Sequence, residues 1–489
     1  MTPATTILLA LAVPLVGAVL IAAAHWSPNV RETITMITAG LLFLLVVSLT
    51  PLVLAGERPV VTLFEIMPGL ALRFEVEPLG MLFGLIASGL WIVNSLYSIG
   101  YMRANDERHQ TRFYVCFAGA LASAIGIAFA GNLLTLFVCY EALTLITYPL
   151  VTHAGTDEAR RAGRVYLGLL VGTSIVFLLV AIIWTWHLTG TIDFKPGGMF
   201  HGKAGNATLG ALLALYVFGI GKAALMPFHR WLPAAMVAPT PVSALLHAVA
   251  VVKAGVFTVV KVVVYVFGVN EIAGLASVQW LPFVAGVTII AASIVALRSD
   301  NLKRRLAYST VSQLSYVVLA VALLTPLSVI GAALHIAAHA LGKITLFFAA
   351  GAIYTAAHKT EVSELDGIGR RMPWTMGAFA IGSLSIIGLP PVVGFVSKWY
   401  IVSGAMATGQ WGAVAVLFAG TLLSAGYLLP IVYRAFFLPL ASPGGHHPAH
   451  GEAPLTMVIA VSASAFGTVA LFFYPDALLA LSRQLAGHG

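Results

Sequence analysis

The chain has 489 residues, of which 60% are hydrophobic and only 9% are charged, and its mean hydropathy is +0.96. Soluble domains carry about 25% charged residues, so this composition excludes a soluble enzyme and indicates a protein that crosses the lipid bilayer many times. Cys116 and Cys139 are the only cysteines and lie in separate apolar runs, which excludes a disulfide framework or a cysteine-based metal cluster. The formal net charge of +8 resides in short loops between apolar runs, so membrane topology explains it better than a nucleic-acid partner does.

Runs of about 18 or more apolar residues predict membrane-spanning helices. We therefore predict an all-α polytopic membrane protein, with residues 1–489 forming a single membrane domain of about fourteen transmembrane helices. No basic residue precedes the first run, TILLALAVPLVGAVLIAAA, so it predicts a helix rather than a signal peptide. The predicted spans are 4–24, 34–54, 78–100, 113–130, 132–152, 165–188, 208–236, 241–268, 276–298, 304–324, 327–356, 374–405, 411–437 and 455–475.

Fourteen helices would place both termini on the same side of the membrane. The loops on the other side hold most of the arginines and lysines, and the positive-inside rule assigns such loops to the cytoplasm. We therefore predict a multi-pass protein of the cell (inner) membrane with both termini external. The basic residues assigned to the cytoplasm are Arg31, Arg103, Arg108, Arg112, Arg160, Arg161, Arg164, Arg298, Lys303, Arg304, Arg305, Lys359, Arg370, Arg371 and Arg434.

Two loops of the predicted external side, 55–77 and 189–207, are longer than the others. They contain TLFEIM, LRFEVE and TIDF, which predict short strands that cap the outer face. On the opposite side, ASPGGHHPAHGEAP follows the thirteenth predicted helix, and its low complexity predicts a solvated loop that includes His446, His447 and His450.

Two of the predicted helices are interrupted by proline. The span 208–236 carries Lys222 followed by Pro227 and Pro233, and the span 374–405 carries GLPP followed by Lys398. Proline removes a backbone donor and breaks a helix, and a membrane tolerates a break only inside protein or beside a cavity. Interrupted helices at positions seven and twelve predict two inverted five-helix repeats, residues 113–268 and 276–437, as in many transporters.

Ionisable residues inside these spans are the candidate functional residues. A buried charge costs about 3 kcal/mol or more at the bilayer centre, so its presence points to an ion pathway. Glu141 lies mid-span and is either a structural residue that holds helices together or the ion-pair partner of Lys222. We favour the pair, in which movement of the glutamate relative to the lysine would load and release a proton.

The eighth predicted helix carries Lys253, which is deep enough to pass a proton towards the second half of the chain. His247 precedes it by six residues and is either a relay member or a packing residue. Lys261 lies further along the same helix, and we expect it nearer an interface and outside the relay.

The segment HIAAHALGKITLFF places His335, His339 and Lys343 four residues apart, so that each lies about 6 Å further along one helical face. A pair of histidines at this spacing also occurs in metal sites, but here a lysine replaces the third ligand and no HExxH carboxylate is present. We predict a water-linked proton wire rather than a metal site, with a structural helix–helix hydrogen bond as the alternative. Lys398 follows the second break and is placed to exchange with one aqueous side.

The sequence contains no Walker A motif, no dinucleotide-binding glycine pattern and no cysteine set for an iron–sulfur cluster. We therefore predict no cofactor. The chain would depend on an ion gradient or on partner subunits for energy, and whether its assembly is an enzyme stays open.

Several long motifs, in order, resemble one known family. GKAALMPFHRWLPAAMVAPTPVSALLHAVAVVKAGVF, LKRRLAYSTVSQLSY, HIAAHALGKITLFFAAG and GLPPVVGFVSKWY are similar to motifs of the antiporter-like subunits of respiratory complex I and of Mrp cation/proton antiporters. The resemblance covers most of the chain and implies fourteen helices with two inverted repeats. It also implies relay roles for Glu141, Lys222, Lys253, Lys398 and the group His335, His339 and Lys343.

Two positions depart from the family pattern. Lys398 stands where some members carry glutamate. Many members read WLPDAH or similar where this chain has Trp231-Leu232-Pro233-Ala234-Ala235-Met236, and the missing acid puts any cation contact there in doubt. The short C-terminus is similar to Mrp D-type and complex I M/N-like subunits, whereas SALLHAVAVVKAGVF is similar to the A-type and L-like ones, so the subfamily stays open.

The leading hypothesis is a proton-translocating subunit of a multi-subunit Mrp-type or complex-I-like assembly. Its partners would be other membrane subunits and protons within the lipid bilayer, and whether sodium moves as well stays open. The alternatives are an energy-coupling subunit of a membrane-bound hydrogenase or of an inorganic-carbon uptake complex, and a scaffold with an inactive channel.

Overall fold

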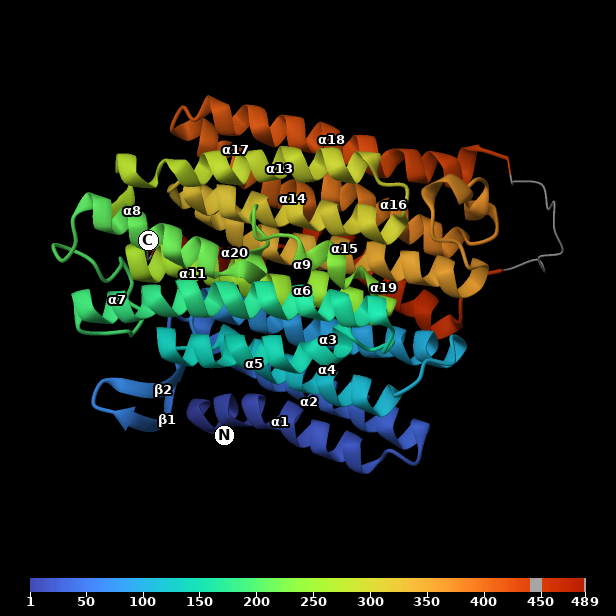
Figure 1. Cartoon of the computed structure of the whole chain (residues 1–489), viewed down its shortest axis with the longest axis horizontal. Coiled ribbons are helices and arrows are strands. Elements are labelled where there is room, and N and C mark those ends of the chain that lie inside the picture. The colour runs from blue at the N-terminus through green and yellow to red at the C-terminus, as the bar shows by residue number, and fades with distance from the viewer. Residues whose placement is uncertain (440–450, 488–489) are drawn as a thin grey trace.

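A computed structural model describes residues 1–439 and 451–487. His446, His447 and His450 of the predicted solvated loop lie outside these residues. Long helices run side by side along the longest axis of the molecule (Figure 1). Within the described residues, eleven helices are long and apolar enough to cross a membrane. This agrees with the predicted class of polytopic helical membrane protein.

The first part of the chain forms α1 (Pro3–Ala23), α2 (Pro28–Leu54) and α3 (Pro78–Ala104), with a hairpin of β1 (Val60–Met67) and β2 (Leu70–Glu75) between the last two helices. The strands are antiparallel, with Val60 opposite Glu75 and Met67 opposite Leu70. The predicted strands at TLFEIM and LRFEVE are therefore confirmed.

The third predicted strand, TIDF, is wrong. Asp193 forms an isolated bridge with Asn132 in place of a strand, and the segment that follows it bonds to the end of a helix. The N–H groups of Lys195 and Met199 donate to the carbonyls of Tyr265 and Val266.

The next helices are α4 (Gln110–Ala128), α5 (Leu133–Val151), α6 (Asp157–Thr173), α7 (Leu179–Thr189) and α8 (Asn206–Gly219), with a π-helical turn, Ser174–Leu178, joining α6 to α7. α6 begins before the predicted residue 165 because the Thr156 hydroxyl caps it and Asp157 and Glu158 occupy its first turn. Acidic side chains there favour the positive end of the helix dipole.

The predicted helix 208–236 is interrupted at Lys222. After α8 come a 3₁₀ turn (Gly221–Ala223), the short α9 (Trp231–Ala234) and another 3₁₀ turn (Ala235–Val237). Side chains satisfy the backbone groups that the break releases: Trp231 Nε1 donates to the Gly221 carbonyl at 2.9 Å, and the Lys222 N–H donates to the Tyr140 hydroxyl at 3.1 Å. The break is thus buried in protein, as a membrane requires.

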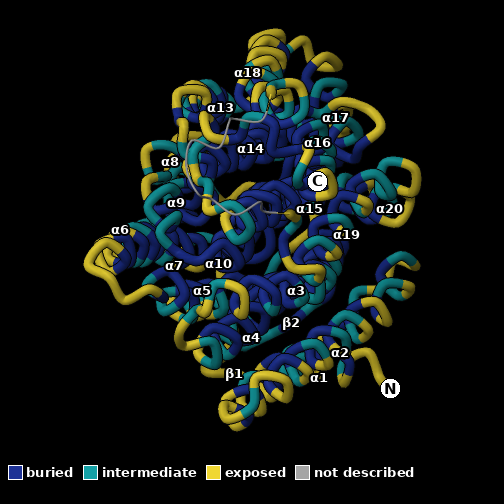
Figure 2. Tube along the Cα trace, turned by 90° about the vertical axis from the view of Figure 1, so that its right-hand side faces the viewer, coloured by how far each residue is buried: buried dark blue, intermediate teal, exposed yellow. Residues whose placement is uncertain are grey.

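Two helical segments form the centre of the bundle, where Figure 2 shows continuous burial. The first consists of α10 (Thr240–Ala244), a π turn (Leu245–Val249), α11 (Val251–Val262) and a second π turn (Val263–Phe267). The second is α15 (Pro326–Ala357). Between them in sequence lie α12 (Val269–Ile272), a 3₁₀ turn (Ala276–Val278), α13 (Trp280–Arg298) and α14 (Leu302–Ala322).

The last part of the chain contains the second interruption. After 3₁₀ turns at Val362–Glu364 and Ile368–Arg370, the predicted helix 374–405 is divided into α16 (Pro373–Ile387) and α17 (Val393–Ala407). α18 (Trp411–Phe437), α19 (Leu455–Phe473) and α20 (Asp476–Ala486) complete the fold. We did not predict α20, which is short and amphipathic and buries Leu478, Leu481 and Leu485 on one face.

Both termini and the β1–β2 hairpin lie at the left end of the molecule in Figure 1. We call the opposite end the basic end. Many of the basic residues assigned to the cytoplasm lie in or next to its loops, which are 104–109, 152–156, 299–301 and 358–372.

Candidate functional site

The predicted ionisable residues, except Glu141, are deeply buried at the centre of the bundle. Lys222, Lys253, His247 and Lys343 are completely inaccessible, and His335, His339 and Lys398 expose at most 7% of their surface. These seven residues are called the central cluster below. They come from both interrupted helices and from the two central helical segments.

Lys222 lies in the 3₁₀ turn of the first break, and α5 holds it from one side. Its ammonium donates to the Tyr140 carbonyl at 2.8 Å and to the Thr144 hydroxyl at 2.5 Å. The same nitrogen lies 3.2 Å from the centroid of the Tyr140 ring, within the range of a cation–π contact. Neutral dipoles and an aromatic face therefore hold this charge.

Glu141 does not form the predicted ion pair in this structure. Lys222 contacts Tyr140 and Thr144, which share one face of α5, whereas Glu141 lies about 100° further round the helix. The carboxylate is half-buried, and its Oε1 is buried without a hydrogen-bond partner. It lies close to Val138 and Leu145, both of which are exposed on the outer face of α5.

Lys253 and His339 join the two central segments. The Lys253 ammonium contacts His339 Nδ1 directly. Four residues earlier on α15, His335 Nδ1 lies 2.9 Å from the Ser397 hydroxyl of α17, and the two imidazole centroids are 6.3 Å apart. An ammonium beside an imidazole opposes the binding of a metal cation, so these contacts favour proton exchange over a metal site.

Lys398 lies at the second break and satisfies the end of α16. Its ammonium donates to the carbonyls of Ile386 and Ile387 at 2.9 and 2.8 Å. It also lies 4.6 Å from the ring centroid of Tyr316, and this ring stacks on His335 with a centroid distance of 5.7 Å. Tyr316 therefore separates Lys398 from the histidines.

Lys343 and His247 lie beside this series. The Lys343 ammonium donates to the Ser309 hydroxyl at 2.8 Å, and Ser309 in turn accepts from the Tyr427 hydroxyl. The His247 ring packs on Phe347 at 4.8 Å, and both of its nitrogens are buried without a partner. His247 is within electrostatic reach of Lys343 and His339.

Sequence reasoning missed Thr144, Tyr316 and Ser309, since hydroxyl residues are common in membrane helices and carry no local signal. It did not foresee the partner of Lys261. This lysine is fully buried and forms an ion pair of 3.2 Å with Glu77, which is itself buried at the start of α3. Glu77 follows the hairpin directly, and its position beside a loop concealed its burial.

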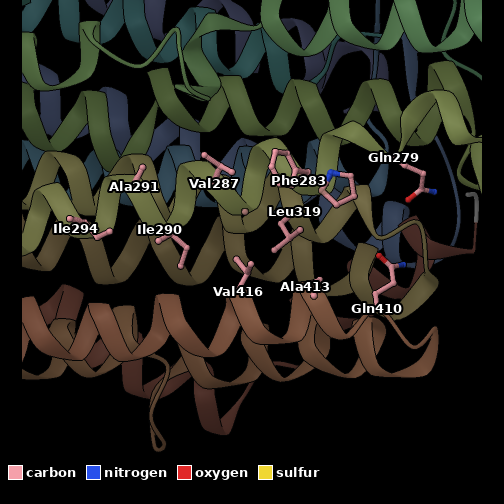
Figure 3. A pocket seen from close by; sticks show the side chains of 13 residues that line it. Gln279, Phe283, Val287, Ile290, Ala291, Ile294, Leu319, Gln410, Ala413 and Val416 are labelled. Carbon is pink, nitrogen blue, oxygen red and sulfur yellow. The ribbon is translucent and has the colours of Figure 1, made fainter.

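A groove of about 740 Å³ lies between α13 and α18, away from the central cluster. Figure 3 shows Gln279 and Gln410 at one end and apolar side chains along the rest. None of the described residues that line the groove is ionisable.

A second cavity, of about 320 Å³, lies at the basic end and is lined by Glu107, Lys303 and Lys359. Burial raises the pKa of the Glu107 carboxyl, against the opposing effect of Lys303. His153 Nε2 lies 3.9 Å from the same carboxylate. Burial and the nearby Arg112 lower the pKa of His153 to about 4, so this imidazole is neutral at physiological pH.

Comparison with known proteins places the chain in a family. A family model described as "NADH:quinone oxidoreductase/Mrp antiporter, TM" matches residues 130–424. NADH-quinone oxidoreductase subunit N of Desulforudis audaxviator is 32% identical over 434 residues, which cover 86% of this chain and 85% of that protein. Subunit L of Mycobacterium tuberculosis is 33% identical over 422 residues, which cover 84% of this chain and 64% of that protein.

The fold has a close counterpart among solved structures. A chain in the structure of the Mrp complex from Dietzia sp. DQ12-45-1b superposes with a TM-score of 0.87 over 100% of this chain and 97% of that chain, at 22% identity. The matched model spans more than half of the sequence, and its residues include the whole central cluster. The chain therefore belongs to the family of membrane subunits found in NADH:quinone oxidoreductases and Mrp antiporters.

Proposed function

We propose that this chain is a proton-translocating subunit of a multi-subunit Mrp-type antiporter or complex-I-like assembly. The observation that carries the proposal is the contact of Lys253 with His339, which links residues far apart in the sequence into one buried ionisable series. Protons would move from the pair Glu141 and Lys222 to Lys253, then to the group His335, His339 and Lys343, and finally to Lys398. His247 lies beside this series.

The contact between Lys253 and His339 gives the series a way to move a proton. An ammonium donates a hydrogen bond to a neutral imidazole nitrogen, and transfer of that proton leaves a neutral amine and an imidazolium. Two cations in contact inside protein repel each other strongly, so only one of the pair carries the proton at a time. Arrival of a proton at one residue therefore favours its release from the next.

The two halves of the chain would be inverted five-helix repeats, residues 113–268 and 276–437, within a fourteen-helix membrane domain. The two breaks support this arrangement, since each is associated with a lysine that satisfies backbone or hydroxyl acceptors. Interrupted helices in corresponding positions of two repeats commonly mark the transport site.

Replacement of Lys222 by methionine tests the function. Lys222→Met keeps the length of the side chain and removes the exchangeable proton, so we expect proton transport by membrane vesicles carrying the assembled complex to fall to the background of empty vesicles. The control is Lys203→Met, since Lys203 lies in the loop before α8 and its ammonium donates to the Thr189 carbonyl, away from the central cluster. Full transport by an assembled Lys222→Met complex would refute the assignment.

The partners decide which assembly the subunit serves. We expect purification in a mild detergent, followed by mass spectrometry, to recover further membrane subunits. Small hydrophobic antiporter subunits would identify an Mrp-type complex, whereas subunits with iron–sulfur centres would identify a respiratory or hydrogenase complex. A chain that purifies alone and still transports protons would contradict the proposed role as a subunit.

A further inference from the structure

A third cavity, of about 470 Å³, lies at the basic end beside α1 and α2, which form the edge of the bundle (Figure 2). One side of it comes from the turn that joins these two helices, and the other comes from the residues around the start of α4. Its basic residues are His25, Arg31, His109 and Arg112. The cavity therefore offers positive charge from two separate parts of the chain.

Arg31 is the buried member of this group, with 4% of its surface exposed. Its guanidinium donates to the Thr111 hydroxyl at 3.2 Å and to the Gln110 side-chain carbonyl at 2.7 Å, and its Nε is buried without a partner among the described residues. The carboxylate of Glu32 lies 3.6 Å from it, but Arg103 bonds to both oxygens of that carboxylate. One negative charge thus serves two arginines, and part of the Arg31 charge is left unneutralised.

The start of α4 adds hydrogen-bond donors to the same wall. The N-cap residue of this 19-residue helix, His109, makes no side-chain cap, and the first turn contains no acidic residue. The first N–H groups of a helix have no partner within the helix, and the helix dipole makes this end positive. Arg112 lies in this turn, is exposed, and uses one nitrogen, Nη2, to donate to the His153 carbonyl at 3.0 Å. An anion in the cavity would therefore meet donors from both α2 and α4.

The composition of the wall favours an anion over a cation. Glu107 is the one carboxylate among the described residues that line the cavity, and it also lines the second cavity, which contains Lys303. Burial raises the pKa of Glu107, so its negative charge is more easily neutralised. Magnesium and calcium sites need several oxygen ligands, usually with more than one carboxylate, and this wall does not provide them.

The surroundings of the cavity indicate where the anion comes from. Trp26, next to His25, is 71% exposed, and tryptophan concentrates where the membrane meets water. Val30 and Ile37 of α2 are also exposed, so apolar surface continues from the cavity along the helix. Basic pockets beside membrane helices on the cytoplasmic side commonly bind lipid phosphates. The volume equals that of about fifteen water molecules, which is enough for a phosphate and the glycerol attached to it.

We propose that this cavity binds the phosphate diester of an anionic phospholipid from the leaflet at the basic end. Arg31 and Arg112 neutralise the phosphate, the first N–H groups of α4 donate to its oxygens, and the acyl chains lie along the apolar surface of α2. The bound lipid ties α2 to the start of α4. The site goes beyond the proposed function and does not depend on it.

Photolabelling of the assembled complex tests the site. The complex, purified in a neutral detergent, is irradiated with a phosphatidylglycerol that carries a photoreactive group close to its phosphate, and labelled peptides are identified by mass spectrometry. We expect label in residues 24–31 and 107–112. Unlabelled phosphatidylglycerol should displace it about tenfold more effectively than phosphatidylcholine, as expected for attraction by one or two basic residues.

Inorganic phosphate separates the two possible sources of the anion. We expect it to displace little label at the lipid concentration used, because it lacks acyl chains to lie along α2. Equal displacement by inorganic phosphate would show a site for free phosphate and would overturn the lipid assignment. Equal displacement by phosphatidylcholine would show ordinary lipid contact and would overturn the site itself.

Arg112 is the residue to change, since Arg31 also supports Gln110 and Thr111. We expect Arg112→Gln to reduce labelling about fivefold, as for loss of one basic residue at a membrane surface, and Arg112→Lys to keep most of it. The matched control is Arg160→Gln, because Arg160 is an exposed arginine of α6 at the same end and lies outside the cavity. Labelling that Arg112→Gln leaves unchanged, or that Arg160→Gln reduces equally, would contradict the site.

Discussion

The Lys222 ammonium directly contacts a carbonyl, a hydroxyl and an aromatic face, whereas the Glu141 carboxylate acts on it from a distance. Such dipolar contacts are weaker and shorter in range than an ion pair, so the protonation of this lysine responds to small displacements of α5. We expect Glu141, a quarter turn away, to act as an adjustable charge rather than as a fixed partner. A rotation or bend of α5 would bring it closer to the ammonium.

Replacement of Thr144 by valine tests these contacts of the Lys222 ammonium. Thr144→Val keeps the shape and removes the 2.5 Å hydroxyl contact with the Lys222 ammonium. A hydrogen bond to a charged group contributes about 1.5–3 kcal/mol, so we expect proton transport to slow roughly tenfold or more while assembly is kept. The measurement is the initial rate of proton uptake by vesicles with equal amounts of complex.

The control for this substitution lies on the same helix. Thr147→Val removes a hydroxyl that bonds to Tyr166 and to backbone carbonyls, without contact to Lys222. If both variants lose the same fraction of transport, packing of α5 rather than the Lys222 contact is responsible.

At the scale of elements, the first break depends on how closely α11 approaches it. Gly255, two residues after Lys253, faces the backbone of Lys222 and Ala223, and a Cβ atom built there would overlap the Lys222 carbonyl group and the Ala223 nitrogen. The absence of a side chain at Gly255 thus lets α11 hold the 3₁₀ turn that carries the lysine.

We expect Gly255→Ala to displace this turn and to reduce both transport and the thermal stability of the purified complex. Overpacking of a tight interior typically costs about 1–3 kcal/mol. The matched control is Gly40→Ala on α2, where nothing lies within 4 Å of the added carbon. A fully active and equally stable Gly255→Ala complex would show that the approach of α11 has no role.

The elements show why the sequence predicted some features and missed others. Long apolar runs predicted the spanning helices, and prolines located both interruptions because they act through the local backbone. The α20 helix was missed because its apolar face is too short for a span. TIDF was misjudged because its backbone bonds to the short turn between α4 and α5 instead of to a strand.

The same limit applies to the site. The buried lysines and histidines could be found from sequence, because charge in an apolar run is conspicuous. Their partners could not be found in this way. Tyr140 rather than its neighbour Glu141 faces Lys222, and Tyr316 rather than a charged residue separates Lys398 from His335. Such choices depend on helix rotation and packing.

At the scale of the whole molecule, the charge of the loops predicts the orientation. Both termini and the hairpin lie at one end and the basic loops at the other, so we expect the hairpin outside the cell and the basic end in the cytoplasm. In a chain with Cys116 and Cys139 replaced by alanine, Thr62→Cys should react with an impermeant thiol reagent on intact cells, and Glu158→Cys only in inverted vesicles. The reverse pattern would invert the proposed topology.

The depth of Lys253 and His339 has an electrical consequence. Both lie near the middle of the long central segments, Thr240–Phe267 and Pro326–Ala357, so a proton passing between them stays at about the same depth in the bilayer. The membrane voltage does work only on charge that moves along its normal, at about 2.3 kcal/mol per elementary charge for each 100 mV. Transfer within this pair is therefore nearly insensitive to voltage. The work against the membrane voltage is done in the steps by which protons enter and leave the protein.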